Sequence, residues 1–405
     1  MRRVARAAAP FGLASFFSDL CHETVSTALP VFITGIGAPP AAIGVVEGAA
    51  DAASAFAKIL GGRVADRARR LKGAAVAGYA VTGVAVPLIG LATSWVHVLL
   101  LRTVGWFGRG FRSPVRDELL SRRVPPGARG AAFGIERAMD QTGALLAPLI
   151  VLALVQGGWG VSEIMLAAVV PGAAAAVALA LGVRERPAAG TVATPDASQA
   201  DAAPDDGAPW PPAFRRLTLA VAAFGVGDFS KLMVVTWAIG GAATSEGPLA
   251  GTLTTSALLY GGYNLVTAPT AWLAGAASDR YGRKPLLFGG YVCGVLGALV
   301  VAASAPGVAP ACIALALFGL LAGSQEVVER AWAADLAPGG KRGRAFGRVH
   351  MVNGVANLVA SGGVAALWKA FGPATAFASA AAAMAFGAAM TLTVPGRTPS
   401  RTPLR

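Results

Sequence analysis

Apolar runs of about 20 residues alternate with short polar, Gly- or Pro-containing breaks along nearly the whole chain. A helix of that length crosses a hydrocarbon layer about 30 Å thick. Twelve such runs are present, and each predicts a transmembrane helix. They lie at approximately residues 10–34, 40–59, 73–93, 96–116, 131–155, 162–183, 217–242, 251–276, 285–304, 309–333, 346–368 and 373–394. The pattern predicts an all-α integral membrane protein.

Composition supports the membrane assignment. Of the 405 residues, 55% are hydrophobic and 14% are charged, whereas a soluble domain carries about 25% charged residues. The first apolar run contains Asp19, His22 and Glu23 near its centre, so we interpret it as a span and not as a cleaved signal peptide. The net charge of +13 lies in short patches between apolar runs, which argues against a nucleic acid partner.

The distribution of basic residues predicts the orientation in the bilayer. With the N-terminus in the cytoplasm, 25 of the 34 Lys and Arg residues fall on inner segments, and one, Lys369, falls on an outer segment. Such an asymmetry sets the topology of helical membrane proteins. We therefore predict a multi-pass protein of the cytoplasmic (inner) membrane with both termini in the cytoplasm.

A polar stretch divides the chain into two halves. Residues 184–215 are rich in Ala, Pro and Asp and hold too little apolar area to order themselves. We predict a flexible cytoplasmic linker there, between an N-terminal six-helix half, 1–183, and a C-terminal six-helix half, 216–405. The halves also repeat one another. Gly62, Asp66, Arg67 and Arg70 lie 213 residues before Gly275, Asp279, Arg280 and Arg283, and residues 129–134 precede the similar residues 342–347 by the same interval. Such repeats predict a substrate cavity between the halves.

The second copy of this motif resembles a known family. Residues 275–284 read Gly-Ala-Ala-Ser-Asp-Arg-Tyr-Gly-Arg-Lys and fit the loop signature G-x-x-x-D-R-x-G-R-K of the major facilitator transporters. The first copy departs from it, with Arg69 in place of Gly and Leu71 in place of a basic residue. The resemblance implies a monomer that works by alternating access, with a cytoplasmic gate that closes while the outside is open. The gate residues it implies are Gly62, Asp66, Arg67, Arg70, Asp117, Gly275, Asp279, Arg280, Gly282 and Arg283.

The gate has a physical basis. Asp66 and Asp279 can accept hydrogen bonds from a helix N-terminus, where an anion is favoured. The arginines can pair with carboxylates at the ends of nearby spans, such as Asp117 or Glu118. Glu326, Glu329 and Arg330 are also predicted to pair at the gate. A weaker match, Gly143 to Pro148, partly resembles the G-x-x-x-G-P motif of proton-antiporting drug exporters and favours export.

Charged residues within the spans are the candidates for proton coupling, because each is costly in a membrane and should be paired or line a cavity. In the first half, more carboxylates than arginines lie at span centres, so not every carboxylate can have a basic partner. At least one carboxylate should therefore hold a proton near neutral pH. The coupling candidates are Asp19 and Glu23, then Asp51 and Asp140, and the pairing candidates are Arg102, Arg109, Arg137, Asp228 and Lys231. The alternative is that these charges are structural pairs that join helices.

Other polar and aromatic residues inside spans are predicted to line the substrate cavity, and these are His22, Glu47, Trp106, Asn264, Asn353 and Asn357. We predict a proton-coupled exporter of a small amphiphilic molecule such as a drug, siderophore or metabolite. The alternative within transport is a proton symporter that imports an organic acid or a sugar. No catalytic constellation, metal spacing or Walker motif is found, so we expect no enzyme activity, cofactor or metal. A membrane sensor is a remote alternative.

Overall fold

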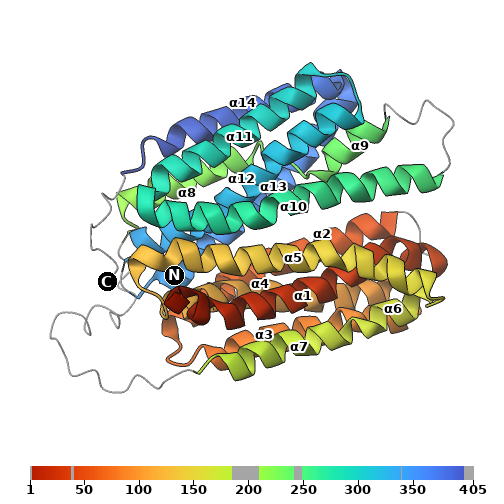
Figure 1. The fold of residues 1–405 in the computed structure, drawn as a ribbon, viewed down its shortest axis with the longest axis horizontal. Helices are drawn as coiled ribbons and strands as arrows, with labels where there is room; N and C mark the ends of the chain where they lie inside the picture. The colour runs from red at the N-terminus through yellow and green to blue at the C-terminus, as the bar shows by residue number, and fades with distance from the viewer. Residues whose placement is uncertain (1, 38–40, 185–208, 241–248, 339, 396–405) are drawn as a thin grey trace. The chain divides into compact units, whose positions relative to one another are not determined.

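The computed structural model describes residues 2–37, 41–184, 209–240, 249–338 and 340–395. Within these ranges all the regular secondary structure is helical (Figure 1). Most of the predicted linker, 185–208, lies outside them, and α8 begins within its last residues. The first helices are α1 (Arg2–Gly35), α2 (Ala41–Arg67), α3 (Lys72–Ala85), η1 (Pro87–Leu91), α4 (Trp95–Ser121), η2 (Pro126–Ala128), α5 (Arg129–Gln156), α6 (Val161–Ala167) and α7 (Val169–Gly182). The later ones are α8 (Pro212–Gly225), α9 (Leu232–Gly240), α10 (Leu249–Tyr281), α11 (Arg283–Ala303), α12 (Val308–Leu336), α13 (Arg342–Phe371) and α14 (Pro373–Thr391).

These helices correspond to the twelve predicted spans, but three spans are not the single α-helix that the apolar pattern predicts. Pro87 has no N–H to donate, and α3 gives way there to the 3-10 helix η1. Pro171 likewise cannot bond the carbonyl of Ala167, where α6 ends. The seventh span is broken between α8 and α9, where a Cβ on Gly227 would lie 2.8 Å from the Met384 side chain. In the third and sixth spans the run stays apolar through the break, so hydropathy does not register it, whereas the break in the seventh span contains Asp228 and Lys231.

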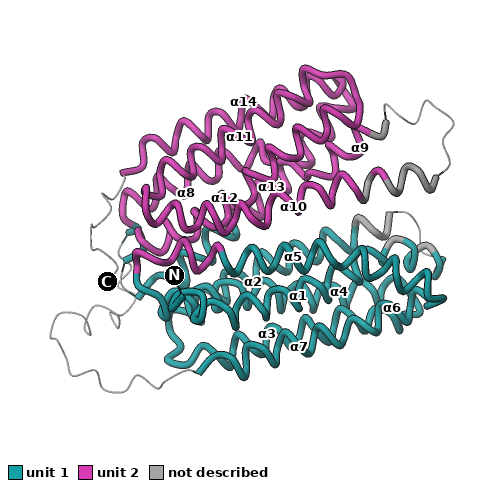
Figure 2. Tube along the Cα trace, viewed as in Figure 1, with its two compact units in different colours: residues 1–125, 135–210, 337–351 teal, residues 126–134, 211–336, 352–405 magenta. Residues whose placement is uncertain are grey.

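The described chain forms two compact units (Figure 2). Unit 1 comprises residues 1–125, 135–210 and 337–351, and unit 2 comprises residues 126–134, 211–336 and 352–405. In unit 1, α2 and α3 pack on α4, and α7 packs on α1 and α3. In unit 2, α10 and α11 pack on α12, and α14 packs on α8 and α11. The second pattern repeats the first, span for span, so the sequence repeat is also a repeat of packing.

Two helices are shared between the units. The first residues of α5 are assigned to unit 2, and the first residues of α13 are assigned to unit 1, while the rest of each helix belongs to the other unit. These two helix starts lie at the second repeated sequence patch, residues 129–134 and 342–347. Each unit therefore holds one loop motif together with one of these helix starts.

Small residues allow the close helix packing of unit 1. A Cβ on Gly110 of α4 would lie 2.8 Å from the Cα of Ser54 in α2, and a Cβ on Gly61 of α2 would lie 2.9 Å from Pro114 in α4. Backbones that approach this closely are typical of membrane helices. The close approach fixes the side chains of α4 that point into unit 1.

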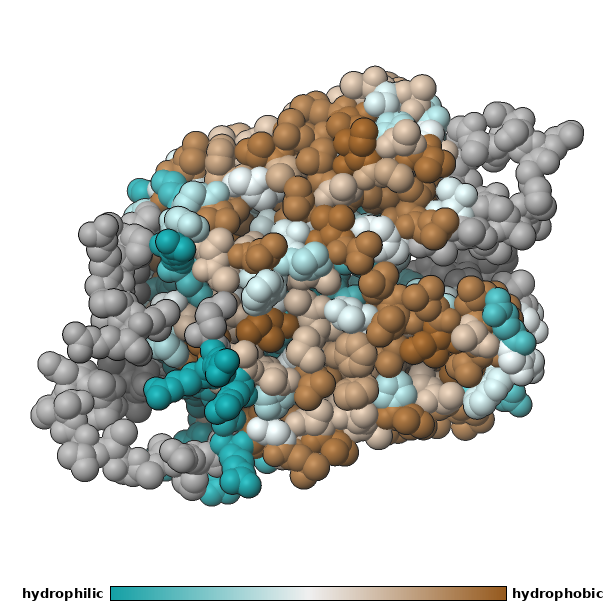
Figure 3. Space-filling view, viewed as in Figure 1, coloured by the Kyte–Doolittle hydropathy of each residue, from teal (hydrophilic) through white to brown (hydrophobic). Residues whose placement is uncertain are grey.

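The outer surface is apolar, as a membrane requires. Many large hydrophobic side chains are exposed in both units, among them Leu181 at 77% and Leu258 at 71%. On the face of unit 1 that Figure 3 draws, hydrophobic side chains cover most of the surface. Among the described residues, seven helical segments are long and apolar enough to cross a membrane. The remaining spans are broken or carry charged or polar residues, and the charged ones hold most of the candidate site.

Candidate functional site

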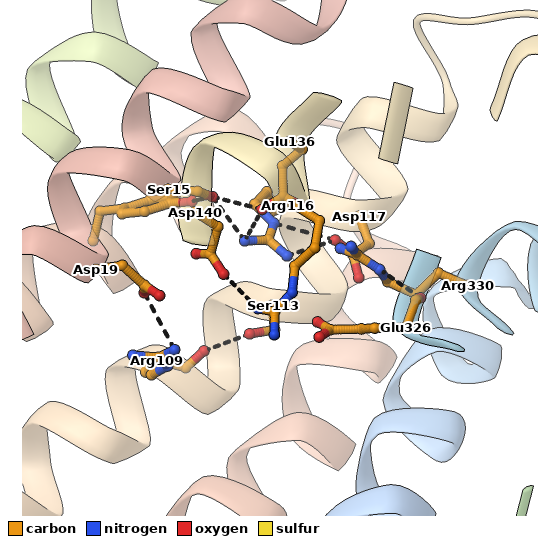
Figure 4. Close-up of polar contacts among 12 residues, drawn as sticks. Ser15, Asp19, Arg109, Ser113, Arg116, Asp117, Glu136, Asp140, Glu326 and Arg330 are labelled. Carbon is orange, nitrogen blue, oxygen red and sulfur yellow. Dashed lines mark hydrogen bonds and ion pairs between the residues drawn. The ribbon is translucent and has the colours of Figure 1, made fainter. Parts of the chain in front are cut away.

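The carboxylates of α1 lie inside unit 1, next to an arginine of α4. Asp19 is 3% exposed, and its Oδ1 is 3.2 Å from Nη2 of Arg109 (Figure 4). His22, one helical turn further along α1, lies 4.0 Å from Asp19 and 3.6 Å from Glu23 through its two ring nitrogens. Within the described part of the chain, His22 is the only basic group that forms an ion pair with Glu23. The two predicted coupling carboxylates therefore lie in one cluster, and an arginine approaches only Asp19 closely.

A second cluster surrounds Arg102 of α4. Its guanidinium lies 3.6 Å from the ring centre of Trp106, donates from Nη1 to Ser26 of α1, and pairs through Nη2 with Glu47 of α2 at 2.9 Å. His22 stacks on the same indole, with ring centres 5.4 Å apart. The structure thus brings together His22, Glu47 and Trp106, which are predicted to line the cavity, around Arg102, a predicted pairing residue that would bind the anion if the protein imports an organic acid. Asp51 is exposed on the same helix as Glu47.

A third cluster joins α1, α4 and α5. Arg116 pairs with Glu136 at 2.7 Å, and Ser15 donates to the same carboxylate and accepts from Arg116 (Figure 4). Arg116 also contacts Asp117, whose other oxygen is 2.8 Å from Nε2 of His350. These residues are buried and fully engaged, which is typical of a structural network. Arg137 and Asp140 of α5 pair one turn apart.

Unit 2 carries fewer charges. Lys231 pairs with Asp228 in the break between α8 and α9, as predicted. Asn264 of α10 is buried at 3% exposure, while Asn357 of α13 is exposed. Asn353 of α13 donates to Glu329 of α12 at 2.6 Å.

Glu329 differs from its predicted role as a pairing residue of the gate. It is 1% exposed, and its two carboxyl oxygens face neutral groups, the Tyr291 hydroxyl at 2.6 Å and the amide of Asn353. No ion pair to Glu329 is present among the residues that the structure describes, so the pairing prediction is wrong for it. Arg330 follows Glu329 directly in the sequence, which suggests an ion pair. Adjacent residues on a helix point in different directions, however, so the two side chains need not meet.

The loop aspartates hold helix N-termini in both units. In unit 1, Asp66 accepts from the backbone N–H of Gly343 at 2.6 Å and of Arg344 at 3.2 Å. In unit 2, Asp279 accepts from the backbone N–H of Gly130 at 3.0 Å and of Ala131 at 2.7 Å. This is the contact that the helix-dipole argument predicts. Gly62 and Gly275 line the same two contacts, because a Cβ on Gly62 would lie 2.7 Å from the carbonyl of Gly343 and one on Gly275 2.9 Å from the carbonyl carbon of Gly130.

Burial raises the pKa of both loop aspartates, which lie beyond the predicted spans. For Asp66 the hydrogen bonds from Arg344 and Gly343 oppose the rise, and for Asp279 the nearby Arg283 and the backbone bonds oppose it. The cause in both is the penalty of holding a charge away from water.

The arginines of the loop motif behave differently from one another. Arg283 pairs with Asp279 at 2.6 Å and with Asp335 at 3.1 Å. Glu118 is held by Arg122 and Arg342. The other motif arginines are exposed, and these are Arg67, Arg70 and Arg280. Gly282 begins α11 with φ of +95°, a conformation that explains the motif glycine.

Sequence reasoning did not identify one further buried charge. Arg112 of α4 is 2% exposed, and its guanidinium lies 3.9 Å from the ring centre of Tyr79. Its spacing of three from Arg109 and four from Arg116 was the available signal, since all three arginines then share one face of α4.

Taken together, two six-span units with paired charges inside define a multi-pass membrane protein of the transporter class. The sequence profile of the Major Facilitator Superfamily matches residues 11–245 and 232–405. The chain belongs to this superfamily, and the predicted fold of twelve transmembrane helices in two six-helix repeats is confirmed.

Individual relatives agree with this assignment. An uncharacterised protein of Mycobacterium tuberculosis is 30% identical over 369 residues, which cover 88% of this chain and 85% of that protein. An uncharacterised transporter of the same superfamily from Methanocaldococcus jannaschii is 28% identical over 365 residues, 88% of this chain and 87% of its own length. A probable sulfoacetate transporter of Cupriavidus necator is 30% identical over 155 residues, 38% of this chain and 36% of its own.

A solved structure shows the same fold. The proton:xylose symporter bound to 6-bromo-6-deoxy-D-glucose has a TM-score of 0.75, with 17% identity, over 98% of this chain and 96% of that one. The transporter class is shown by the family match.

Proposed function

We propose that this protein is a proton-coupled exporter, which exchanges protons for a small amphiphilic molecule across the cytoplasmic membrane. The halves 1–183 and 216–405, joined by the linker 184–215, would alternate access as a monomer with both termini in the cytoplasm. The observation that carries the proposal is the cluster of Asp19, His22 and Glu23 beside Arg109 in the interior of unit 1. Carboxylates in such a position are rare in membrane proteins and mark ion pathways.

The cluster gives a simple exchange of partners. In the described conformation Oδ1 of Asp19 lies 3.2 Å from Nη2 of Arg109, within ion-pair distance. A proton that binds Asp19 removes the attraction, so Arg109 is released to rearrange within the unit. When the proton leaves, the ion pair forms again. Glu23, with His22 as its partner, provides a second carboxylate along the same helix face, and Asp51 and Asp140 are the further candidates.

Glu329 is an additional candidate in unit 2. Burial disfavours the charged form of the Glu329 carboxylate, and no cation among the described residues pairs with it, although the Tyr291 hydroxyl and the Asn353 amide donate hydrogen bonds to it. It can therefore hold a proton in this conformation and release it when water reaches it. The loop aspartates Asp66 and Asp279 would serve the cytoplasmic gate, since each holds the start of a helix that is shared between the units.

The experiment is proton flux in energised inside-out vesicles, followed with a pH-sensitive dye while a panel of compounds is added. Wild type is compared with Asp19→Asn and Glu23→Gln, and with Glu163→Gln as a control, because Glu163 is an exposed carboxylate at the N-terminus of α6. We expect compound-dependent proton release in wild type and in the control, and its loss in at least one α1 variant. Intact proton release in both α1 variants would remove the coupling assignment.

One observation favours a second function, proton-driven import of an organic acid. Arg102 and Arg109 lie seven residues apart on α4 and flank Trp106, at 3.6 and 6.0 Å from its ring centre. The partial similarity to a probable sulfoacetate transporter points the same way. Uptake of an acid into right-side-out vesicles with proton entry, together with no proton release in inside-out vesicles, would select this alternative.

A further inference from the structure

Arg102 is held in place by contacts that leave part of its hydrogen-bonding capacity unused. Its side chain is buried at 4% exposure, its Nη1 donates to Ser26 at 3.0 Å, and its plane lies on Trp106. Its Nε is buried and has no hydrogen-bond partner. A buried donor without a partner is costly, and most such donors in proteins are satisfied.

The partner on its other side is much less constrained. Glu47 is 38% exposed and contacts the guanidinium through its Oε1, which lies 2.9 Å from Nη2. A planar oxyanion that contacts both Nε and Nη2 makes two parallel hydrogen bonds and is bound more tightly than through a single bond. Glu47 in its present position thus leaves the Nε donor of the same guanidinium unused.

We propose that Arg102 binds the carboxylate or sulfonate group of the transported molecule, which displaces Glu47 and takes the Nε and Nη2 donors together. Trp106 and His22, which stack beside the guanidinium, contact the apolar part of the same molecule. The substrate is then an amphiphilic organic anion. This inference rests on the proposed function only in placing the cluster on the transport path, and it names the substrate class without choosing the direction of transport.

The geometry favours an anion at this cluster over a cation. A cationic substrate would have to take Glu47 from Arg102 and leave that buried arginine without its carboxylate, and an unpaired buried charge is strongly destabilising. An anionic substrate replaces one carboxylate by another. The displaced Glu47 is already partly exposed, so its release leaves no fully buried charge behind.

The test is ligand binding by the full-length protein in lipid nanodiscs, with no gradient, so that it is independent of proton coupling. The ligands are phenylacetate and phenylmethanesulfonate, with phenylacetamide and phenethylammonium as the neutral and cationic matches. Binding is measured as ligand-dependent stabilisation against heat. The variants are Arg102→Lys and Glu47→Gln, and the matched controls are Arg63→Lys and Glu163→Gln, whose side chains are exposed.

The two site variants are expected to act in opposite directions. Arg102→Lys should weaken binding of both anions by about tenfold or more, because a lysine cannot form the two parallel bonds. Glu47→Gln should strengthen it several-fold, because the internal competitor has lost its charge. Binding of phenylacetamide should be unchanged in both site variants. Both control variants should bind the anions as wild type does.

Three results would overturn the inference. One is weaker anion binding in Glu47→Gln, which would show that Glu47 supports the site and does not compete for it. Another is tight binding of phenethylammonium that Glu47→Gln abolishes, which would make this a cation site. The third is no anion binding even by the Glu47→Gln protein, where the carboxylate that pairs with Arg102 has been neutralised. Anion binding without proton release in vesicles would instead reject the proposed coupling and leave the anion site standing.

Discussion

Replacing Asp66 by Asn tests the loop motif at the atoms where it acts. Asp66 accepts three hydrogen bonds, from the backbone of Gly343 at 2.6 Å, from the backbone of Arg344 at 3.2 Å and from Nε of Arg344 at 2.7 Å. An asparagine of the same size keeps one acceptor oxygen and carries no charge. At least one backbone N–H at the start of α13 therefore loses its partner, and the guanidinium of Arg344 loses its ion pair.

The size of the effect follows from these bonds. A hydrogen bond to a charged group contributes about 1.5–3 kcal/mol, and loss of a helix N-cap costs about 0.5–2 kcal/mol. The two figures describe overlapping contacts, so they are not added, and a change of about 2 kcal/mol is expected. A difference of about 1.4 kcal/mol is a factor of ten, so the first turn of α13 should open about thirty times more often.

Hydrogen exchange followed by mass spectrometry measures this opening directly, since amide exchange reports the free energy of local unfolding. The amides of residues 342–346 should exchange about thirtyfold faster in Asp66→Asn. The chain supplies its own matched control, because Asp279→Asn should instead accelerate the amides of residues 129–133 through the bonds to Gly130 and Ala131.

Two results would refute the reasoning. One is unchanged exchange at residues 342–346 in Asp66→Asn, which would mean that the aspartate contributes nothing to the helix start. The other is the same acceleration at both helix starts in both variants, because a general loosening of the protein would then explain it.

Two further predictions concern single residues, Gly62 and Glu329. Gly62→Ala should lower the free energy of unfolding by about 1–3 kcal/mol, because the added Cβ would lie 2.7 Å from the carbonyl of Gly343. The loss is measured as a lower unfolding temperature in detergent. Gly48→Ala in the same helix should cause no such loss, since nothing lies within 4 Å of its Cβ, and equal losses in the two variants would argue against a tight contact at Gly62. Glu329→Gln should leave the unfolding temperature equal to that of wild type or higher, because a neutral amide replaces a buried carboxyl that has no ion-pair partner among the described residues. Proton-driven transport should fall in the same variant. A lower unfolding temperature with normal transport would assign Glu329 a structural role only.

The number of spans, the repeat and the family could all be predicted from the sequence, because each follows from local properties of the chain. Apolar length predicts a membrane helix wherever it occurs, and the Gly-x-x-x-Asp-Arg motif recurs in the order of the chain. The acceptor role of Asp66 and Asp279 could also be predicted, since a helix start offers free N–H groups wherever it lies. The breaks in the third and sixth spans could not, because Pro87 and Pro171 interrupt the helix without interrupting the apolar run.

The partners of the charges were decided by the tertiary structure. Asp19 is separated from Arg109 by 90 positions in the chain, and only the packing of unit 1 brings them to 3.2 Å. The same holds for Arg102, which the packing places between Ser26, Glu47 and Trp106, and for Glu329, which it places against Tyr291 and Asn353 and not against a cation. A sequence shows that a charged residue lies within a span. Which charge faces it depends on how helices distant in the chain pack, because electrostatic interactions depend on distance in space.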